Sequence, residues 1–390
     1  MTAPRLERVV VVGNGIAGLT ASDSLRAAGF DGELTVVGDE RHAPYSRPAL
    51  SKAALLDLGE EMSAHHLPEP SHGATELLGV SAAGLDVSRR TVLLDDGTDL
   101  PYDGVVIATG SRARRLGTGR EAGSHELTLR GLDDALELRR RIATKPSVVV
   151  VGGGALGMEI ASGCLAAGCE VTLASPEPPL VQQLGTYLSD VFVAAGLRHG
   201  LKIASAQAVD IRDAGGHAAV TLADGSVLEA ELVVSAVGDV PNLEWLATSG
   251  LLTDGRLDVD TRGRVRPGVV AAGDVATFAT ARGPRRVPLW TSAIEQSKIA
   301  ALGLVQGDAA PELNFQQYFW TEQFGLNLKA CGFMPAAGAP EVVDGDPHDG
   351  AALLRWSHDD GSGTAVALNY RIPVPKLRRL SAATPVAVPA

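Results

Sequence analysis

The sequence contains the same strand–turn–helix pattern twice, and this repeat limits the folds that the chain can adopt. The first copy covers residues 9–37 (VVVVGNGIAGLTASDSLRAAGFDGELTVV) and the second covers residues 148–174 (VVVVGGGALGMEIASGCLAAGCEVTLA). Each copy begins with four valines, the continuous apolar run of a strand that is covered on both faces. Each helix is expected to end at a glycine, Gly29 or Gly168. The repeat therefore predicts an α/β fold with two dinucleotide-type units.

The first copy carries a glycine-rich turn between its strand and its helix. Gly13 permits a tight bend, Gly15 lets the backbone approach a pyrophosphate, and Gly18 lets the helix pack closely on the strand. The helix N-terminus then offers free N–H groups to phosphate. Two acids, Asp39 and Glu40, follow the second strand, where an acceptor for ribose hydroxyls is needed. This context favours dinucleotide binding over a purely structural turn.

The second copy has the same turn but a different strand end. Ser175 follows its second strand where an acid is usual, and no arginine occurs from residue 171 to residue 197 to hold a 2′-phosphate. This unit is expected to bind NAD(P), with a weak preference for NADH. Its turn consists of Gly152, Gly153, Gly154, Ala155, Leu156 and Gly157.

Composition argues against several other classes of protein. The 390 residues predict two or three domains, at roughly 100–200 residues each. The net charge of −12 disfavours binding to nucleic acid or to an anionic membrane surface. Three cysteines cannot build a disulfide framework, so a reducing, cytoplasmic location is expected. The apolar run at residues 9–12 is too short for a membrane span or a signal peptide, and no metal site is expected.

Two further segments carry local signals. In RPGVVAAGDVAT (residues 266–277), Asp274 follows a strand end and suits an acceptor for a ribityl hydroxyl; a helix N-cap is the alternative. Ser292 and Glu295 form an S-x-x-E pattern that predicts a helix over residues 293–305. Residues 116–146 are charged with a helical pattern and are interpreted as a connector between the two units.

The order of these motifs carries a family resemblance. The first turn, YDGVVIATGS (residues 102–111), the second turn and AAGDVA (residues 271–276) resemble the FAD-dependent pyridine nucleotide-disulfide oxidoreductases. Three stretches are more specific: PYSRPALSK (residues 44–52), LRGLDDAL (residues 129–136) and YFWTEQFG (residues 318–325). With them the chain resembles the NAD(P)H-dependent ferredoxin and rubredoxin reductases, which supply electrons to cytochromes P450 and ring-hydroxylating oxygenases.

The resemblance implies a glutathione reductase-like fold with two Rossmann-like domains and a small α+β C-terminal domain. The FAD-binding domain would be discontinuous, over residues 1–115 and 245–312. Residues 116–244 would form the NAD(P)-binding domain, and residues 313–390 the C-terminal domain. No cysteine pair occurs in residues 44–52, where relatives with a dithiol relay carry one, so Cys164 and Cys169 are interpreted as packing residues.

The resemblance also implies roles for individual residues. Lys52 would stabilise negative charge on the reduced flavin, Glu159 would lie near the nicotinamide and pair with Lys52, and Trp320 would stand on the acceptor side. Without the resemblance these three would be interpreted as a surface lysine, a solvated carboxylate and a core tryptophan. The residues expected to bind FAD are Gly13, Gly15, Ala17, Gly18, Asp39, Glu40, Arg47, Lys52, Thr109, Gly110, Arg130, Asp274 and Trp290. Those expected to bind NAD(P) are Gly152, Gly154, Leu156, Gly157, Glu159, Ser175 and Gly238.

The expected function is that of an NAD(P)H:ferredoxin oxidoreductase, which passes hydride to FAD and single electrons to a ferredoxin. Two alternatives stay open: a related flavoenzyme that acts on a small organic molecule, and a redox-sensing flavoprotein that binds NAD(P)H. An acidic ferredoxin would need a local basic surface. The candidates are Arg282, Arg285 and Arg286, or Lys376, Arg378 and Arg379, although solvated loops are the alternative. The sequence does not indicate an oligomeric state.

Overall fold

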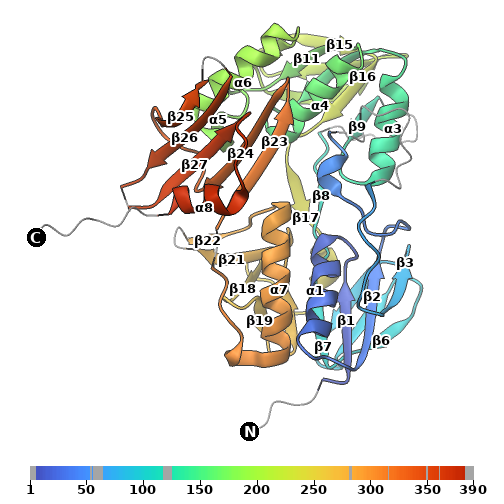
Figure 1. Cartoon of the computed structure of the whole chain (residues 1–390). Coiled ribbons are helices and arrows are strands. Elements are labelled where there is room, and N and C mark those ends of the chain that lie inside the picture. Colours follow the sequence, from blue (N-terminus) through green and yellow to red (C-terminus); the bar gives the residue numbers. More distant parts are fainter. Residues whose placement is uncertain are drawn as a thin grey trace, which may run out of the picture. The chain divides into compact units, whose positions relative to one another are not determined.

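The structure, a computed structural model, describes residues 6–52, 55, 65–116, 125–280, 283–314, 316–347, 350–359 and 361–382 (Figure 1). The chain divides into two compact units, each built from separate stretches of sequence. Unit 1 consists of Met1–Ser46, Met62–Arg112 and Val240–Phe315, and unit 2 of Arg47–Glu61, Ala113–Asp239 and Gln316–Ala390. We describe each unit by itself.

Unit 1 is built on a six-stranded sheet with the strand order β19-β20-β7-β1-β2-β3. Every neighbouring pair is parallel except β19 and β20, which are antiparallel. The helices α1 (Ile16–Ala27) and α7 (Trp290–Gln306) pack against each other. The strands are β1 (Arg8–Val12), β2 (Glu33–Gly38), β3 (Thr75–Leu78), β7 (Gly104–Ile107), β19 (Arg264–Arg266) and β20 (Val269–Ala271).

The four valines of β1 are buried on both faces of this sheet, as their pattern predicted. Val9 and Val11 belong to a core cluster with residues of α1 and α7, such as Leu25. Val10 and Val12 belong to a second cluster, which includes residues of a three-stranded antiparallel sheet of β4 (Ala82–Asp86), β5 (Thr91–Leu94) and β6 (Asp99–Pro101). Burying one such side chain contributes roughly 1.5–3 kcal/mol, so the strand is fixed from both sides.

Smaller elements complete unit 1. A second three-stranded sheet has the order β18-β21-β22. Its strands are β18 (Leu257–Val259), β21 (Ala276–Thr280) and β22 (Gly283–Arg285), and the short 3-10 helices are η3 (Glu244–Leu246) and η4 (Gly307–Ala309).

Unit 2 contains a fully parallel five-stranded sheet with the order β12-β11-β10-β16-β9. The helix α4 (Ala155–Ala166) follows β10 just as α1 follows β1. The strands are β9 (Glu126–Thr128), β10 (Ser147–Val151), β11 (Glu170–Ala174), β12 (Lys202–Ala204) and β16 (Leu232–Ser235). Around them lie α3 (Leu132–Ile142), α5 (Val181–Leu184), α6 (Thr186–Arg198) and an antiparallel sheet of β13 (Ala208–Asp213), β14 (Ala218–Leu222) and β15 (Val227–Ala230).

The interpretation of residues 116–146 as a connector was wrong for the part that the structure describes. β9 pairs in parallel with β16 and extends the main sheet of unit 2, and α3 buries Leu132, Leu138 and Ile142. β9 has only three residues, too few for an alternating pattern to be recognised in the sequence. Residues 117–124 lie outside the described residues.

The C-terminal part of unit 2 forms a five-stranded antiparallel sheet with the order β23-β24-β27-β26-β25, followed by α8 (Val374–Ser381). Its strands are β23 (Tyr318–Gln323), β24 (Leu326–Gly332), β25 (Glu341–Asp346), β26 (Ala351–Ser357) and β27 (Gly363–Leu368).

Two short strands, β8 (Ser111–Ala113) and β17 (Asp239–Pro241), pair with each other. The short 3-10 helix η1 (Arg47–Ala49) precedes Lys52. The expected fold class, two Rossmann-like sheets and a small α+β part, is confirmed.

The two repeats also share a turn at the end of their first helix. Gly29 and Gly168 take positive φ angles of 93° and 90°, as predicted for glycines that stop a helix. After α4, the N–H of Cys169 donates to the carbonyl of Cys164 at 3.0 Å, and both side chains are buried. A hydrophobic contact between these two positions is typical of this helix stop, which supports their interpretation as packing residues. Their mutual hydrogen bond raises the pKa of Cys164 and lowers that of Cys169.

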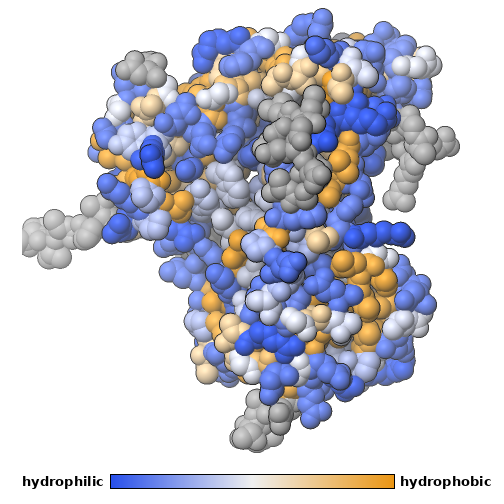
Figure 2. Space-filling model, turned by 45° about the vertical axis from the view of Figure 1, so that its right-hand side comes forward, coloured by the Kyte–Doolittle hydropathy of each residue, from blue (hydrophilic) through white to orange (hydrophobic). Residues whose placement is uncertain are grey.

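In the part of the chain that the structure describes, no helix is long and apolar enough to cross a membrane. Figure 2 shows hydrophilic side chains over most of the face in view, with hydrophobic ones in separate patches.

Candidate functional site

The first glycine-rich turn, in unit 1, requires glycine at two positions for steric reasons. Gly13 has a φ of 115°, and a Cβ there would lie 2.2 Å from the carbonyl oxygen of Ala108. A Cβ on Gly18 would lie 1.7 Å from the carbonyl oxygen of Gly13. Gly15 differs, because its Cβ would meet no atom within 4 Å. The turn is therefore tightly packed on its inner side and open at the start of α1.

The open side of this turn offers unused hydrogen-bonding groups. Gly15 is the N-cap of α1, and no described side chain caps the helix there. Both side-chain amide atoms of Asn14 are buried and have no hydrogen-bond partner among the described residues. Buried polar groups without partners are rare in folded proteins and call for a ligand or water. An anionic pyrophosphate matches the free N–H groups, so the turn fits the phosphates of FAD.

The two acids after β2 differ in their surroundings. Asp39 is exposed, whereas the Oε2 atom of Glu40 accepts a hydrogen bond of 2.5 Å from the hydroxyl of Tyr45. A Cβ on Gly38 would lie 2.8 Å from the Cβ of Asn14, so the end of β2 adjoins the glycine-rich turn. Both acids are near the turn, and the Asp39 side chain is the more accessible.

The sheet order brings further expected FAD residues to the same edge. β7, β1 and β20 lie in one parallel block, so the segments that follow them meet at the carboxyl end of the sheet. Thr109 follows β7 and exchanges two hydrogen bonds of 2.9 Å with Asn242. Asp274 follows β20, and a turn and then β21 come after it, so the helix N-cap alternative was wrong. Gly110 takes a φ of 62°, and Ala17 is buried in the first turn of α1.

The start of α7 differs from the S-x-x-E expectation. The helix begins at Trp290 with Leu289 as its N-cap, and no described side chain forms a cap hydrogen bond. Ser292 is instead buried inside the first turn, at 3% exposure. Pro288 precedes the N-cap, and the extended Leu289 after it sets the helix start ahead of the serine.

The second glycine-rich turn, in unit 2, repeats the geometry of the first. Gly152 has a φ of 109°, and its Cβ would lie 2.3 Å from the carbonyl oxygen of Ala236. A Cβ on Gly157 would lie 1.9 Å from the carbonyl oxygen of Gly152. The two repeats thus build the same close helix–turn contact, the arrangement by which a backbone approaches a dinucleotide phosphate.

The N-terminus of α4 is occupied, unlike that of α1. The backbone N–H of Ala155 donates to Oε1 of Gln183 at 2.8 Å. Gln183 lies in α5, which begins after Leu180, a buried residue held at a positive φ of 67°. Leu180 N–H donates to the carbonyl of Gly153 at 2.7 Å and so ties α5 to the turn. Sequence reasoning missed Gln183, because no local pattern indicates which side chain reaches a helix N-terminus.

The remaining expected NAD(P) residues lie around this turn. Ser175 is buried, and its hydroxyl donates to the carbonyl of Glu177 at 2.7 Å. Leu156 is 37% exposed in the first turn of α4. Gly238 has a φ of 97° with open space at its Cβ position. The carboxylate of Glu177 is exposed and accepts from Gln182 at 2.7 Å.

A cluster of polar side chains in unit 2 centres on Glu159, which lies in α4. Its Oε2 atom accepts from Nζ of Lys52 at 2.9 Å and from the hydroxyl of Ser51 at 2.5 Å. Its Oε1 atom accepts from the hydroxyl of Thr321, in β23, at 2.6 Å. The Lys52 and Glu159 side chains are 14% and 6% exposed. The expected pairing of Lys52 with Glu159 is therefore present, and Ser51 and Thr321 are additional partners that the sequence reasoning did not name.

Ser51 and Thr321 stand inside the two stretches, PYSRPALSK and YFWTEQFG, that carry the resemblance. Their presence in these stretches is the signal by which they could have been found.

Trp320 lies beside this cluster. Its ring stacks on that of Tyr318, with centroids 5.7 Å apart, and Nζ of Lys52 lies 6.0 Å from the Trp320 ring centroid. The Trp320 side chain is partly exposed. Aromatic rings such as these can stack on a flat ligand.

The two expected arginines also lie in unit 2. A guanidinium nitrogen of Arg47 donates to the carbonyl of Arg130 at 2.9 Å. The backbone N–H groups of Arg130 and Gly131 donate to Asp134 at the start of α3, at 2.8 and 3.0 Å. The stretch LRGLDDAL therefore forms a helix start that fixes the backbone of Arg130.

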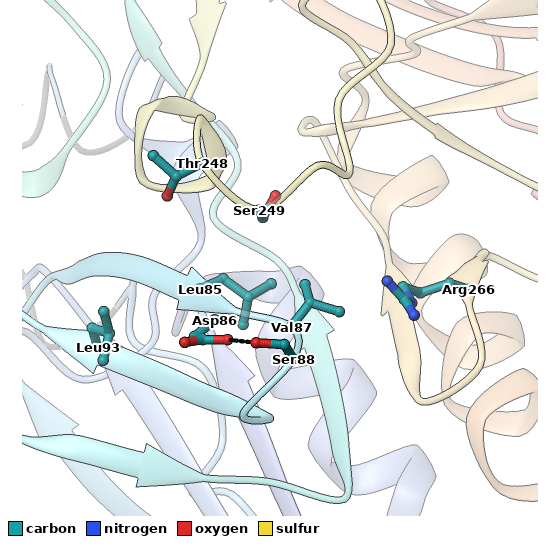
Figure 3. A pocket seen from close by; sticks show the side chains of 8 residues that line it. All are labelled: Leu85, Asp86, Val87, Ser88, Leu93, Thr248, Ser249 and Arg266. Atoms are coloured by element: carbon teal, nitrogen blue, oxygen red, sulfur yellow. Dashed lines mark hydrogen bonds between the residues drawn. The ribbon is translucent and has the colours of Figure 1, made fainter.

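A groove in unit 1 is lined by none of the expected site residues; Figure 3 shows the residues that line it. The Asp86 carboxylate accepts hydrogen bonds from the backbone N–H of Arg89 and from the hydroxyl of Ser88, which lower its pKa. The groove is lined by Leu85, Asp86, Val87, Ser88, Leu93, Thr248, Ser249 and Arg266. Among the described residues no group of three or more acidic, histidine or cysteine side chains could hold a metal ion.

Comparison with known proteins agrees with this geometry. Residues 7–297 match the family model described as pyridine nucleotide-disulphide oxidoreductase. The chain belongs to this family.

Individual members of the family resemble the chain over most of its length. It is 33% identical over 354 residues to the ferredoxin–NAD(+) reductase component of the p-cumate 2,3-dioxygenase system of Pseudomonas putida, which covers 88% of this chain and 85% of that protein. The ferredoxin reductase for the CYP199A2 system from Rhodopseudomonas palustris has a TM-score of 0.84 at 30% identity, over 93% of this chain and 91% of that one. The covalent putidaredoxin reductase–putidaredoxin complex contains a chain with a TM-score of 0.85 at 26% identity, over 97% of this chain and 93% of that one.

Proposed function

We propose that this protein is an FAD-dependent NAD(P)H:ferredoxin oxidoreductase that serves a cytochrome P450 or another oxygenase. The observation that carries the proposal is the buried Lys52–Glu159 pair beside Trp320, in a chain with two phosphate-type glycine turns. The relatives named as ferredoxin–NAD(+) reductase components support the same activity. The partner is a ferredoxin, the cofactor is FAD, and the electron donor is NADH.

The first turn would hold the phosphates of FAD through the N-terminus of α1, and the acids after β2 and β20 would accept from hydroxyl groups of the cofactor. Bound FAD supplies the chemistry of accepting a hydride and releasing electrons singly. The NAD(P)H phosphates would bind at the N-terminus of α4. Lys52 would place a fixed positive charge at the reacting end, where charge stabilisation lowers the barrier. The complete set of proposed residues is the one that the resemblance implied.

The choice of NADH over NADPH rests on the end of β11. Ser175 follows this strand, and residues 171–197 contain no arginine to pair with a 2′-phosphate. The domain boundaries at residues 115, 245 and 313, and the cytoplasmic location, stay proposals.

The basic helix α8 is the better of the two candidate surfaces for the ferredoxin. Lys376 and Arg379 are exposed, and Leu377 between them is fully buried in a cluster that also contacts Tyr318. Because Tyr318 stacks on Trp320, the apolar cluster that contains Leu377 of α8 adjoins the aromatic pair at which we propose that electrons leave.

The other candidate surface has fewer exposed charges than the sequence suggested. Arg285 is exposed, but Arg286 donates to the carbonyl of Asp274 at 3.0 Å, and Arg282 lies outside the described residues. The Arg286 side chain is therefore bonded to the backbone at Asp274, and of the two described arginines Arg285 is the exposed one.

Stopped-flow spectroscopy tests the proposed function. The purified protein with its bound flavin is mixed with NADH or NADPH, and the loss of flavin absorbance is followed before a ferredoxin is added. We expect rapid reduction by NADH and reoxidation by the ferredoxin. Reduction by NADH without transfer to any ferredoxin would favour a flavoenzyme that acts on a small molecule, and no reduction by either nucleotide would contradict the proposal.

A further inference from the structure

We propose that Thr321 and Gln323 are positioning residues that hold the carboxylate of Glu159 in place for Lys52. The inference rests on the proposed function, in which Lys52 and Glu159 belong to the reacting centre. It goes beyond that function because it assigns a role to two residues of β23 that only the tertiary structure brings to α4.

The hydrogen bonds form a chain with one direction. The Nε2 atom of Gln323 donates to Oγ1 of Thr321 at 2.8 Å, and Oγ1 of Thr321 donates to Oε1 of Glu159 at 2.6 Å. A threonine hydroxyl carries a single hydrogen. Because Gln323 donates to the Thr321 oxygen, this hydrogen is left for Glu159.

The other oxygen of Glu159 receives the remaining donors. Lys52 and Ser51 both donate to Oε2. Together with Thr321, they make Glu159 the acceptor of three hydrogen bonds. Thr321 is the only described partner that holds Oε1. Loss of its hydroxyl would free the carboxylate to rotate, and the oxygen that faces Lys52 would no longer be fixed.

Burial argues that this chain is more than ordinary packing. Thr321 is 0% exposed and Gln323 is 3% exposed. The Oε1 atom of Gln323 is buried without a hydrogen-bond partner among the described residues, which is unfavourable for stability. Apolar residues of similar size would pack β23 on α4 without that penalty. This series of hydrogen bonds, which ends in an unsatisfied atom, is therefore better explained by its support of the Glu159 carboxylate.

The register of β23 explains how one strand serves both the cluster and the aromatic pair. Thr321 and Gln323 are two positions apart and share the buried face, whereas Tyr318 and Trp320 belong to the other face. Substitutions at Thr321 can therefore change the support of Glu159 without changing the face that carries Trp320.

The test compares three variants of buried threonines in the same C-terminal sheet. Thr321→Val removes the hydroxyl at nearly constant volume, and Thr321→Ser keeps it. Thr364→Val is the matched control, because Thr364 is also 0% exposed and its hydroxyl also makes a hydrogen bond, to the carbonyl of Phe333 just after β24. The rate constant for flavin reduction at saturating NADH and the NADH concentration for half-saturation are measured for each.

We expect Thr321→Val to lower the rate constant by about ten- to a hundredfold, the range for loss of one hydrogen bond to a charged group. The half-saturating NADH concentration should be unchanged. Thr321→Ser should restore the rate to within about threefold, and Thr364→Val should stay within the same range. A Thr321→Val protein as fast as the wild type, or a Thr321→Ser protein as slow as Thr321→Val, would overturn the proposal.

A double-mutant cycle separates positioning from a general structural effect. If Thr321 acts through Glu159, Glu159→Gln should slow the Thr321→Val protein much less than it slows the wild type. Additive effects would overturn the proposal.

The same cycle measured on unfolding by denaturant needs no hydride transfer. If neither nucleotide reduces the wild-type flavin, the proposed function fails, and the unfolding cycle still decides whether Thr321 and Glu159 are coupled. Coupling there would support the positioning role, and additivity would refute it.

Discussion

The Nζ atom of Lys52 lies 2.9 Å from Oε2 of Glu159, although the two residues are 107 positions apart in the sequence. Both side chains are largely buried, so water cannot take the place of either partner without a change in the structure. A buried ion pair of this kind is weak evidence for stability, because desolvation offsets the attraction between the charges. The ion pair lies beside Trp320, and the role that we propose for it is in the reaction and not in stability.

Breaking this ion pair from one side should destabilise the protein. Lys52→Met leaves a buried carboxylate without its charged partner, and we expect a loss of about 3 kcal/mol in the free energy of unfolding. The double variant Lys52→Met/Glu159→Gln should recover more than half of that loss, because no charge is left unpaired. Urea denaturation measures both, with Lys298→Met, an exposed lysine of α7, as a control that should change stability by less than about 0.5 kcal/mol. Equal losses in the single and double variants would contradict this account.

Alanine at the two glycine turns should separate the two nucleotide sites. Gly15→Ala meets no protein atom within 4 Å, so the protein should fold but bind FAD at least about tenfold more weakly, since the new methyl group occupies the phosphate position. Gly154→Ala approaches only the Gln183 side chain, at 3.4 Å, and should keep its FAD while it weakens binding of NADH. Flavin content after purification and titration with NAD⁺ measure the two effects. Full FAD content in Gly15→Ala would refute the assignment of the first turn.

Removal of the Gln183 side chain should strengthen nucleotide binding. Its carboxamide oxygen accepts the Ala155 N–H that we expect a pyrophosphate oxygen to take, so the two compete. Gln183→Ala should lower the dissociation constant for ADP-ribose by about two- to tenfold, the value of one neutral hydrogen bond. Gln182→Ala is the matched control, because its neighbouring side chain donates to Glu177 instead. Calorimetric titration provides the measurement, and weaker binding by Gln183→Ala would show that the amide assists the phosphate.

Electron transfer to the ferredoxin should depend on the charge of α8. Replacing Lys376 and Arg379 with Glu should slow ferredoxin reduction and leave the reduction of flavin by NADH unchanged, because acidic ferredoxins are attracted by a basic surface. Higher salt should have the same selective effect on the wild type. Arg285→Glu tests the second surface, and Arg212→Glu, at a residue whose side chain is 79% exposed on β13, is the control. Ferredoxin reduction that responds to neither salt nor charge reversal would exclude docking on α8.

The local signals of the chain were sufficient for the two dinucleotide units. Four valines before a glycine predicted β1 and β10, because a strand covered on both faces needs an unbroken apolar run. Gly29 and Gly168 predicted the ends of α1 and α4, because only glycine adopts a positive φ without strain. Signals of this kind depend on backbone conformation within a few residues, so they can be recognised without the rest of the fold.

Signals that were short or ambiguous led to errors. β9 has too few residues for a pattern, and the S-x-x-E motif at Ser292 lies within a helix that begins earlier, at Trp290. In both cases packing decided the element: β9 adds to the edge of the sheet next to β16, and Ser292 is buried.

The sequence by itself thus determined the two glycine turns, their strands and helices, and the family to which they belong. Only the tertiary structure decided which side chains meet. Thr321 reaches Glu159 across 162 positions, Gln183 caps α4 from a separate helix, and Lys52 lies against Trp320. These contacts depend on how distant elements pack. A hydrogen bond between such elements leaves no signal in the local sequence of either partner, because it forms only when donor and acceptor are placed to within a few tenths of an ångström.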